Sequence, residues 1–118
     1  MAKFLFVLSR GMDDPVRATR CIHLATVAKK EGHEVSVFLI DDGVNIARIG
    51  MVDHMKSPTG DELKGLLDYL IKEQVPILVC TPCADARHMG EEDLVKSARF
   101  ESAKLLIGLA VDAKVLTF

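Results

Sequence analysis

The sequence predicts a three-layer α/β/α domain built around a mainly parallel sheet of about five strands. Three mainly apolar segments, at 3–9, 35–40 and 76–80, have the length of strands that are covered on both faces. Segments with helical periodicity separate these runs, and strands that alternate with helices are typical of a parallel sheet. With 118 residues, the chain is expected to form one domain, residues 1–118.

A long helix is predicted between the first two strands. Asp14 is suited to cap its start, and Pro15 fits the first turn, where its missing N–H is not needed. Apolar residues then recur at helical spacing as far as Lys30, and Gly32 supplies a stop signal. The apolar positions are Ala18, Cys21, Ile22, Ala25 and Ala28.

The middle of the chain contains a turn, a short helix and a longer helix. The second strand ends in Asp41-Asp42-Gly43, which is typical of a turn. Residues 44–49 are expected to form a short helix, and residues 50–60 an irregular segment. A stripe of apolar residues then predicts a helix capped by Thr59 or Asp61. The stripe consists of Leu63, Leu66, Leu67, Leu70 and Ile71.

The last third of the chain continues the alternation. The third strand leads into a predicted loop at 81–90, and the three acidic residues at 91–93 suit the positive end of a helix dipole. The remaining elements are a weak strand at 98–100, a helix at 102–111 and a strand at 115–118.

Composition narrows the class of protein. The 49% of hydrophobic residues excludes intrinsic disorder, and the net charge of -2 lacks the basic excess of a generic nucleic-acid binder or polybasic membrane-surface protein. No apolar stretch reaches the roughly 18 residues that span a bilayer, and the run at 4–8 is too short for a signal peptide. We therefore expect a cytoplasmic protein that binds neither nucleic acid directly nor a membrane. Three cysteines, an odd number, make a disulfide framework unlikely in that compartment.

The predicted sheet directs attention to one cysteine-containing segment. Ligands of parallel sheets gather at the carboxyl ends of the strands. There, the sequence runs Cys80-Thr81-Pro82-Cys83-Ala84-Asp85-Ala86-Arg87-His88. We expect Arg87, His88 and a helical turn starting near Ala84 to lower the pKa of the Cys80 thiol. The other edge loops offer Arg10 and His54, which are more simply explained as solvated loop residues, and Cys21 is expected in the core.

Three kinds of chemistry use cysteines spaced as Cys80 and Cys83 are. A structural zinc site needs four ligands, and only His54 and His88 are available as partners, which disfavours zinc. A thioredoxin-type dithiol also has the form C-x-P-C, but its motif follows an early strand and a proline-preceded strand comes later, whereas here Pro76 precedes the motif. In sulfur transfer, one accessible thiolate accepts a sulfane sulfur as a persulfide, with no need for a metal or an organic cofactor.

Nearly the whole chain resembles one known family. The segments that carry the resemblance are FLFVLSRGMDDPVRA, EGHEVSVFLIDDGVNIA, LVCTPCADARHMGEEDLV and AKVLTF. They resemble the DsrE/DsrF-like proteins, which include the TusD sulfur-relay subunit. The resemblance implies a DsrEFH-like fold and a persulfide on Cys80, with Arg87 and His88 stabilising the anionic sulfur. Two positions depart from the family: a glycine is common where His88 stands, and TusD-type subunits lack Cys83. A Cys80–Cys83 disulfide could release the sulfur as sulfide, with Cys83 as the resolving thiol, or the pair could act as a redox switch.

The resemblance also implies an assembly and partners. It implies a sulfurtransferase or persulfide carrier that forms a dimer, trimer or hexamer and exchanges sulfur with donor and acceptor proteins. Two alternatives stay open: a non-catalytic module that senses a small ligand or redox state, and a C-x-x-C dithiol oxidoreductase. Separately, the mean hydropathy of +0.22 is high for a small protein, and Leu105–Val111 contains no polar residue. That helix is expected to be buried at a subunit interface.

Overall fold

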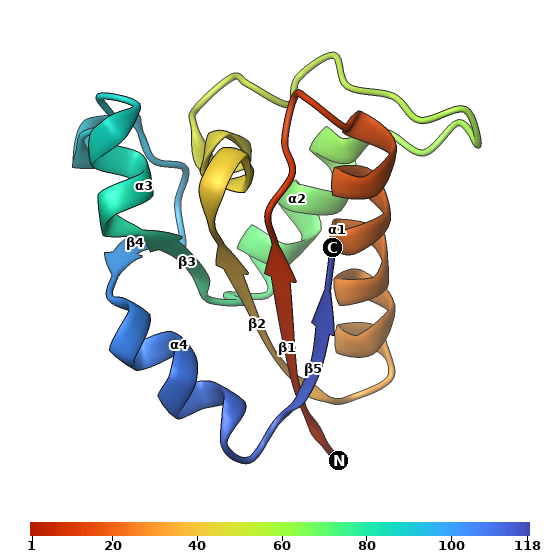
Figure 1. The fold of residues 1–118 in the computed structure, drawn as a ribbon. Coiled ribbons are helices and arrows are strands. Elements are labelled where there is room, and N and C mark those ends of the chain that lie inside the picture. Colours follow the sequence, from red (N-terminus) through yellow and green to blue (C-terminus); the bar gives the residue numbers. More distant parts are fainter.

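The computed structural model describes all 118 residues and contains one five-stranded sheet, in which every strand pairs in parallel with its neighbours (Figure 1). The strands are β1 (Lys3–Leu8), β2 (Glu34–Leu39), β3 (Ile77–Cys80), β4 (Ala98–Glu101) and β5 (Lys114–Thr117). The α-helices are α1 (Pro15–Lys30), α2 (Leu63–Lys72), α3 (Thr81–Ala86) and α4 (Ala103–Ala110), and the 3-10 helices are η1 (Asp41–Ala47) and η2 (Glu91–Asp93). The predicted α/β class and parallel sheet are confirmed.

The order of the strands explains how one edge collects the loops. Across the sheet the order is β4-β3-β2-β1-β5. The chain first extends the sheet from β1 to β4, and α4 then returns it to the far side of β1 (Figure 1). All carboxyl ends therefore lie along one edge, the upper edge in Figure 1, where η1 and α3 follow β2 and β3. The loops after adjacent strands β2 and β3 meet there, although about 40 residues separate them in sequence.

Helices α1 and α2 close one face of the sheet. The larger hydrophobic core, 23 buried residues, lies between these helices and the alternate residues of the central strands. Phe6, Leu39 and Val79 contribute from the sheet, while Cys21 and Leu67 contribute from the helices. Burying this apolar surface supplies most of the favourable free energy of folding.

Helix α4 covers the opposite face incompletely. The core on this side has only four fully buried residues, Leu5, Val7, Phe38 and Leu78, which pack against half-buried leucines of α4. No residue of α4 is fully buried, and Ile107 is 66% exposed. The two faces of one sheet thus differ sharply in how completely they are covered.

Of the two predicted helix N-caps, one is confirmed and one is wrong. Asp14 caps α1 as expected, since its carboxylate accepts a hydrogen bond from the Arg17 N–H at 3.2 Å. The prediction that Thr59 or Asp61 caps α2 is wrong, because Glu62 occupies that position and makes no side-chain cap. The Thr59 hydroxyl instead donates to the Asp61 carboxylate at 2.8 Å, so these two side chains satisfy one another.

The segment after β3 also differs from the prediction. Residues 81–90 were expected to form a loop, but α3 begins at Thr81, directly after the strand, with Pro82 in its first turn. Proline suits that position because the first N–H groups of a helix have no partner within it. The predicted helix at 44–49 likewise begins earlier, as η1 at Asp41. None of the helices is long and apolar enough to cross a membrane.

Candidate functional site

Cys80 is the last residue of β3 and immediately precedes α3. Its register partner is Glu101 at the end of β4, and the Thr81 hydroxyl donates to the Glu101 carbonyl at 3.1 Å. These contacts hold the strand end and the helix start against the edge of the sheet. Cys80 is half-buried there, so its expected position at the carboxyl edge is confirmed.

The expected low pKa of Cys80 is contradicted. The pKa of this thiol is raised above its ordinary value, mainly by burial and then by contact with the Cys83 thiol. The backbone N–H of Cys83 acts in the opposite direction, because it hydrogen-bonds to the Cys80 sulfur, and the negative charge of Asp41 adds to the rise. Neither Arg87 nor His88 is among the groups that shift it.

Cys83 has a different set of contacts. The Asp41 N–H donates to the Cys83 sulfur at 3.3 Å, and the Cys83 thiol lies 3.9 Å from the Asp41 carboxylate. Asp41 has a left-handed backbone with φ of 50°, which is uncommon outside glycine, asparagine and aspartate. This conformation accompanies the hydrogen bond between the Asp41 N–H and the neighbouring sulfur. The start of η1 therefore forms one wall of the cysteine site.

Arg87 connects α3 to η1 rather than contacting Cys80. Its guanidinium donates to the Asp42 carboxylate at 2.8 Å and to the Cys83 carbonyl at 3.0 Å, and the Asp42 ion pair raises the pKa of Arg87. Arg48 donates to the Arg87 carbonyl at 3.1 Å. Because Arg87 follows Cys83 by one helical turn, its positive charge lies on the Cys83 side of the pair.

His88 is exposed and ends helix α3. Its φ of 56° is left-handed, the N–H of His88 donates to the Asp85 carbonyl at 3.1 Å, and the N–H of Met89 donates to the Ala84 carbonyl at 3.0 Å. These two hydrogen bonds form a Schellman motif, in which the left-handed residue is usually glycine. His88 thus stands where the backbone favours glycine, which fits the departure noted in the sequence.

Sequence reasoning assigned the segment Asp41-Asp42-Gly43 only to a turn and missed its role in the site. Asp41 contacts Cys83, and Asp42 pairs with Arg87. A Cβ atom at Gly43 would overlap the carbonyl oxygen of Leu8, so η1 packs directly on the end of β1. The signal was available in principle, because loops after adjacent parallel strands meet at the same edge.

The remaining candidates lie outside this cluster. Arg10 pairs with Asp13 at 3.1 Å, and His54 is exposed without a hydrogen bond, which agrees with solvated loop residues. Cys21 is fully buried in the core, as predicted. No group of three or more His, Cys, Asp or Glu side chains has the arrangement of a metal site.

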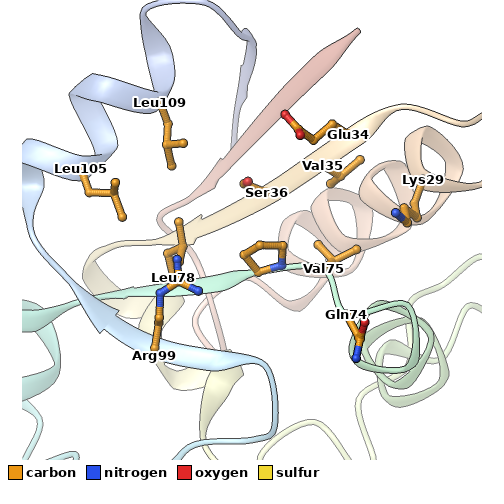
Figure 2. Close-up of a pocket in the computed structure, with 11 residues that line it drawn as sticks. Lys29, Glu34, Val35, Ser36, Gln74, Val75, Leu78, Arg99, Leu105 and Leu109 are labelled. Atoms are coloured by element: carbon orange, nitrogen blue, oxygen red, sulfur yellow. The ribbon is translucent and has the colours of Figure 1, made fainter. Parts of the chain in front are cut away.

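The cavities of the molecule do not include the two thiols. A pocket of about 400 Å³ lies on the α4 side of the sheet. Its lining includes Leu105 and Leu109 of the helix and Leu78, Ser36 and Arg99 of the sheet (Figure 2). Neither Cys80 nor Cys83 lines it or any of the other pockets. The cysteine pair therefore lies outside the cavities of the molecule.

Comparison with known proteins agrees with the fold. A sequence model of the DsrE/DsrF-like family matches residues 2–118. The chain belongs to the DsrE/DsrF-like family. The MJ0989 protein of Methanocaldococcus jannaschii is 30% identical, over 98% of this chain and 99% of its own length. The MK0008 protein of Methanopyrus kandleri is 28% identical, over 95% of this chain and 89% of its own length.

Solved structures share the fold of this DsrE/DsrF-like chain. The crystal structure of YchN from E. coli superimposes with a TM-score of 0.82 over 100% of both chains, at 24% sequence identity. The MTH1491 protein of Methanobacterium thermoautotrophicum has a TM-score of 0.70 at 15% identity, again over 100% of both chains. At these identities the likeness concerns the fold, and the arrangement of strands and helices is a family property.

Proposed function

We propose that this protein carries sulfane sulfur as a persulfide on Cys80 and passes it between donor and acceptor proteins. The observation that supports this most directly is the half-buried Cys80 thiol at the carboxyl end of β3, directly before the first turn of α3. Membership of the DsrE/DsrF-like family supports the same chemistry. Thiolate sulfur is the nucleophile in such transfers.

The proposed transfer is a thiol exchange at sulfur. The Cys80 thiolate attacks the terminal sulfur of a donor persulfide, and the donor cysteine leaves as its thiolate. The new persulfide extends one sulfur beyond Cys80 and carries the negative charge, which the Cys83 N–H, Arg87 and His88 are proposed to stabilise. Because the pKa of Cys80 is raised, uptake is expected to accelerate as the pH rises through and above the ordinary range of a thiol.

The proposal includes a homo-oligomer in the cytoplasm. Ile107 on α4 and Val111, which directly follows the helix, are 66% and 82% exposed, although both are large and apolar. Burying them between copies of the chain removes apolar surface from water, so we propose α4 as a subunit contact. A reducing compartment suits a chain whose three cysteines are all free. A monodisperse monomer in solution would contradict the proposed assembly.

Intact-mass measurement tests the persulfide. The protein is incubated with a persulfide donor, desalted and weighed, beside the Cys80→Ser variant. Wild type should gain the mass of one sulfur atom, which cyanide removes, and Cys80→Ser should gain none. Cys21→Ser is the matched control, because that thiol is buried in the core and should not affect uptake. Uptake that survives Cys80→Ser would overturn the assignment.

A second candidate function is a dithiol oxidoreductase. The observation in its favour is the contact between the Cys80 and Cys83 thiols, which a single-thiol carrier does not need. In that case mild oxidation should remove two hydrogens from the protein mass, Cys83→Ser should abolish the change, and no sulfur should be taken up. A protein that neither takes up sulfur nor oxidises in this way would instead be a binding module.

A further inference from the structure

The two thiols of the site have unequal surroundings. Cys80 is at the strand end, where it packs beneath α3 against apolar side chains of both cores. Cys83 receives a hydrogen bond from the Asp41 N–H at 3.3 Å, and the positive charge of Arg87 lies on its side of the pair. Once Cys80 is loaded, Cys83 is the free thiol of the same chain that lies three residues on, in the first turn of α3. The geometry therefore points to Cys83 as the attacking sulfur.

We infer that Cys83 attacks the Cys80 persulfide within the same chain, so that the protein releases its sulfur as hydrogen sulfide and closes a Cys80–Cys83 disulfide. This inference rests on the proposed persulfide at Cys80. It gives the protein a reductive outlet for sulfane sulfur in addition to transfer to an acceptor.

The step balances without an external oxidant. The Cys83 thiolate attacks the inner sulfur of the persulfide, the bond between the Cys80 sulfur and the terminal sulfur breaks, and a new bond joins the Cys80 and Cys83 sulfurs. The terminal sulfur leaves with the electron pair of the broken bond and takes up the proton that Cys83 gave up. The sulfane sulfur is reduced to sulfide, and the two thiols are oxidised to a disulfide. An external dithiol reductant then restores both thiols by exchange.

The backbone geometry permits this closure. Cys80 directly precedes α3 and Cys83 is in its first turn. Residues three positions apart along a helix are neighbours, and the Cα atoms of disulfide-linked residues are separated by no more than about 7 Å. In the reduced protein the Cys83 side chain is near enough to Cys80 to raise the pKa of its thiol. Disulfide formation therefore requires side-chain rotation rather than movement of the strand or the helix.

Arg87 and Asp42 act as positioning residues for this step. Their 2.8 Å ion pair joins α3 to η1, and the 3.0 Å bond from Arg87 to the Cys83 carbonyl fixes the turn that carries the attacking sulfur. Asp41, next in the chain to Asp42, supplies the N–H that contacts this sulfur. Breaking the ion pair should loosen this contact without removing either thiol.

A single-turnover assay tests the inference. The full-length protein is loaded with inorganic polysulfide, desalted without reductant, and followed by intact mass and by trapping of free sulfide. Wild type should first gain the mass of one sulfur atom, as the carrier proposal requires. It should then release one sulfide per sulfur taken up and finish two hydrogens lighter than the reduced protein. Cys83→Ser should take up sulfur but hold it as a stable persulfide, and Cys83→Ala should repeat that result. Asp42→Asn should take up sulfur and release sulfide more slowly than wild type.

Each other outcome has a distinct meaning. If wild type and Cys83→Ser hold the persulfide equally well, or release sulfide equally fast, the inference is overturned while the carrier proposal stands. If neither protein takes up sulfur, the carrier proposal fails and the inference falls with it. Release that slows on dilution of the protein would show attack between chains and would also overturn it. Far-ultraviolet circular dichroism confirms that each variant is folded.

Discussion

Two regions of the molecule contain cysteines in opposite environments. One is the face of the sheet that α1 and α2 cover, and the other is the carboxyl edge, where α3 and η1 lie. Cys21 lies on the closed face, fully buried, and burial raises the pKa of its thiol to about 12. At the edge, Cys80 and Cys83 are half-buried and are contacted by N–H groups, a carboxylate and a second thiol. The same residue type is a core hydrophobe in one region and a candidate reactive group in the other, and the polar groups brought to it make the difference.

The closed face should be the most costly region to disturb. Leu67→Ala removes a side chain that is 2% exposed in the larger core and should lower the free energy of unfolding by about 2–5 kcal/mol. Leu109→Ala is the matched control, because that leucine of α4 is only half-buried and its loss should cost clearly less. Urea unfolding measures both. Equal losses would show that α4 covers its face as completely as α1 and α2 cover theirs.

The carboxyl edge should be sensitive to added bulk at one glycine. A Cβ atom at Gly43 would overlap the Leu8 carbonyl oxygen, so Gly43→Ala should destabilise the protein by about 1–3 kcal/mol and move η1 away from the site. Gly108→Ala on α4 meets no atom within 4 Å and should stabilise its helix by up to about 1 kcal/mol. Thermal unfolding should therefore shift in opposite directions for these two identical substitutions.

The buried thiol of Cys21 should make stability depend on pH. Its folded pKa of about 12 lies above the ordinary value of 9.0, so the folded state holds this proton more tightly than the unfolded state. The contribution of the neutral thiol is intact below pH 9.0 and is lost progressively between pH 9.0 and about 12. At pH 10 the loss should be roughly 1.4 kcal/mol. Cys21→Ala should flatten this part of the pH profile in urea unfolding; an unchanged slope would contradict the assignment.

The left-handed backbone of His88 at the carboxyl edge should lower the stability of the folded protein. Because its φ of 56° is strained for a residue with a Cβ atom, His88→Gly should stabilise the protein by about 0.5–1 kcal/mol. Gln74→Gly is the matched control, with a φ of 58° at a position that contacts neither thiol. Both variants should melt at higher temperature, and only His88→Gly should shorten the lifetime of the persulfide. Equal lifetimes would remove His88 from the proposed sulfur site.

Asp41 should have the smallest effect on stability and a clear effect on reactivity. Asp41→Asn keeps the N–H that contacts Cys83 and suits the left-handed backbone, but it removes the charge that helps to raise the pKa of Cys80. The pKa of Cys80 should fall, so its alkylation should begin at lower pH. Asp68→Asn, on α2 and paired with Lys64, should leave the alkylation profile unchanged. Peptide mass mapping distinguishes the two thiols.

Much of the architecture was predictable because it depends on local patterns. The continuous apolar runs predicted β1, β2 and β3, since strands covered on both faces need apolar residues in succession. The Asp14 cap of α1 was also predictable from a local pattern, because a capping side chain bonds to an N–H within three residues. The cap of α2 was not, because Thr59 and Asp61 are occupied by each other. There the capping propensity of both residues is outweighed by the hydrogen bond from Thr59 to Asp61.

The amino-acid sequence by itself determined the alternation of strands and helices and the location of Cys80 at the carboxyl end of a strand. Only the tertiary structure decided which neighbours surround each sulfur. Asp41 and Asp42 reach the site because β2 lies beside β3. The Asp41 N–H donates a hydrogen bond to the Cys83 sulfur, and the Asp42 carboxylate pairs with the Arg87 guanidinium near Cys83. Burial then raises the pKa of Cys80 instead of lowering it. The physical reason is that charge interactions and desolvation depend on distance in space, which periodicity along the chain does not contain.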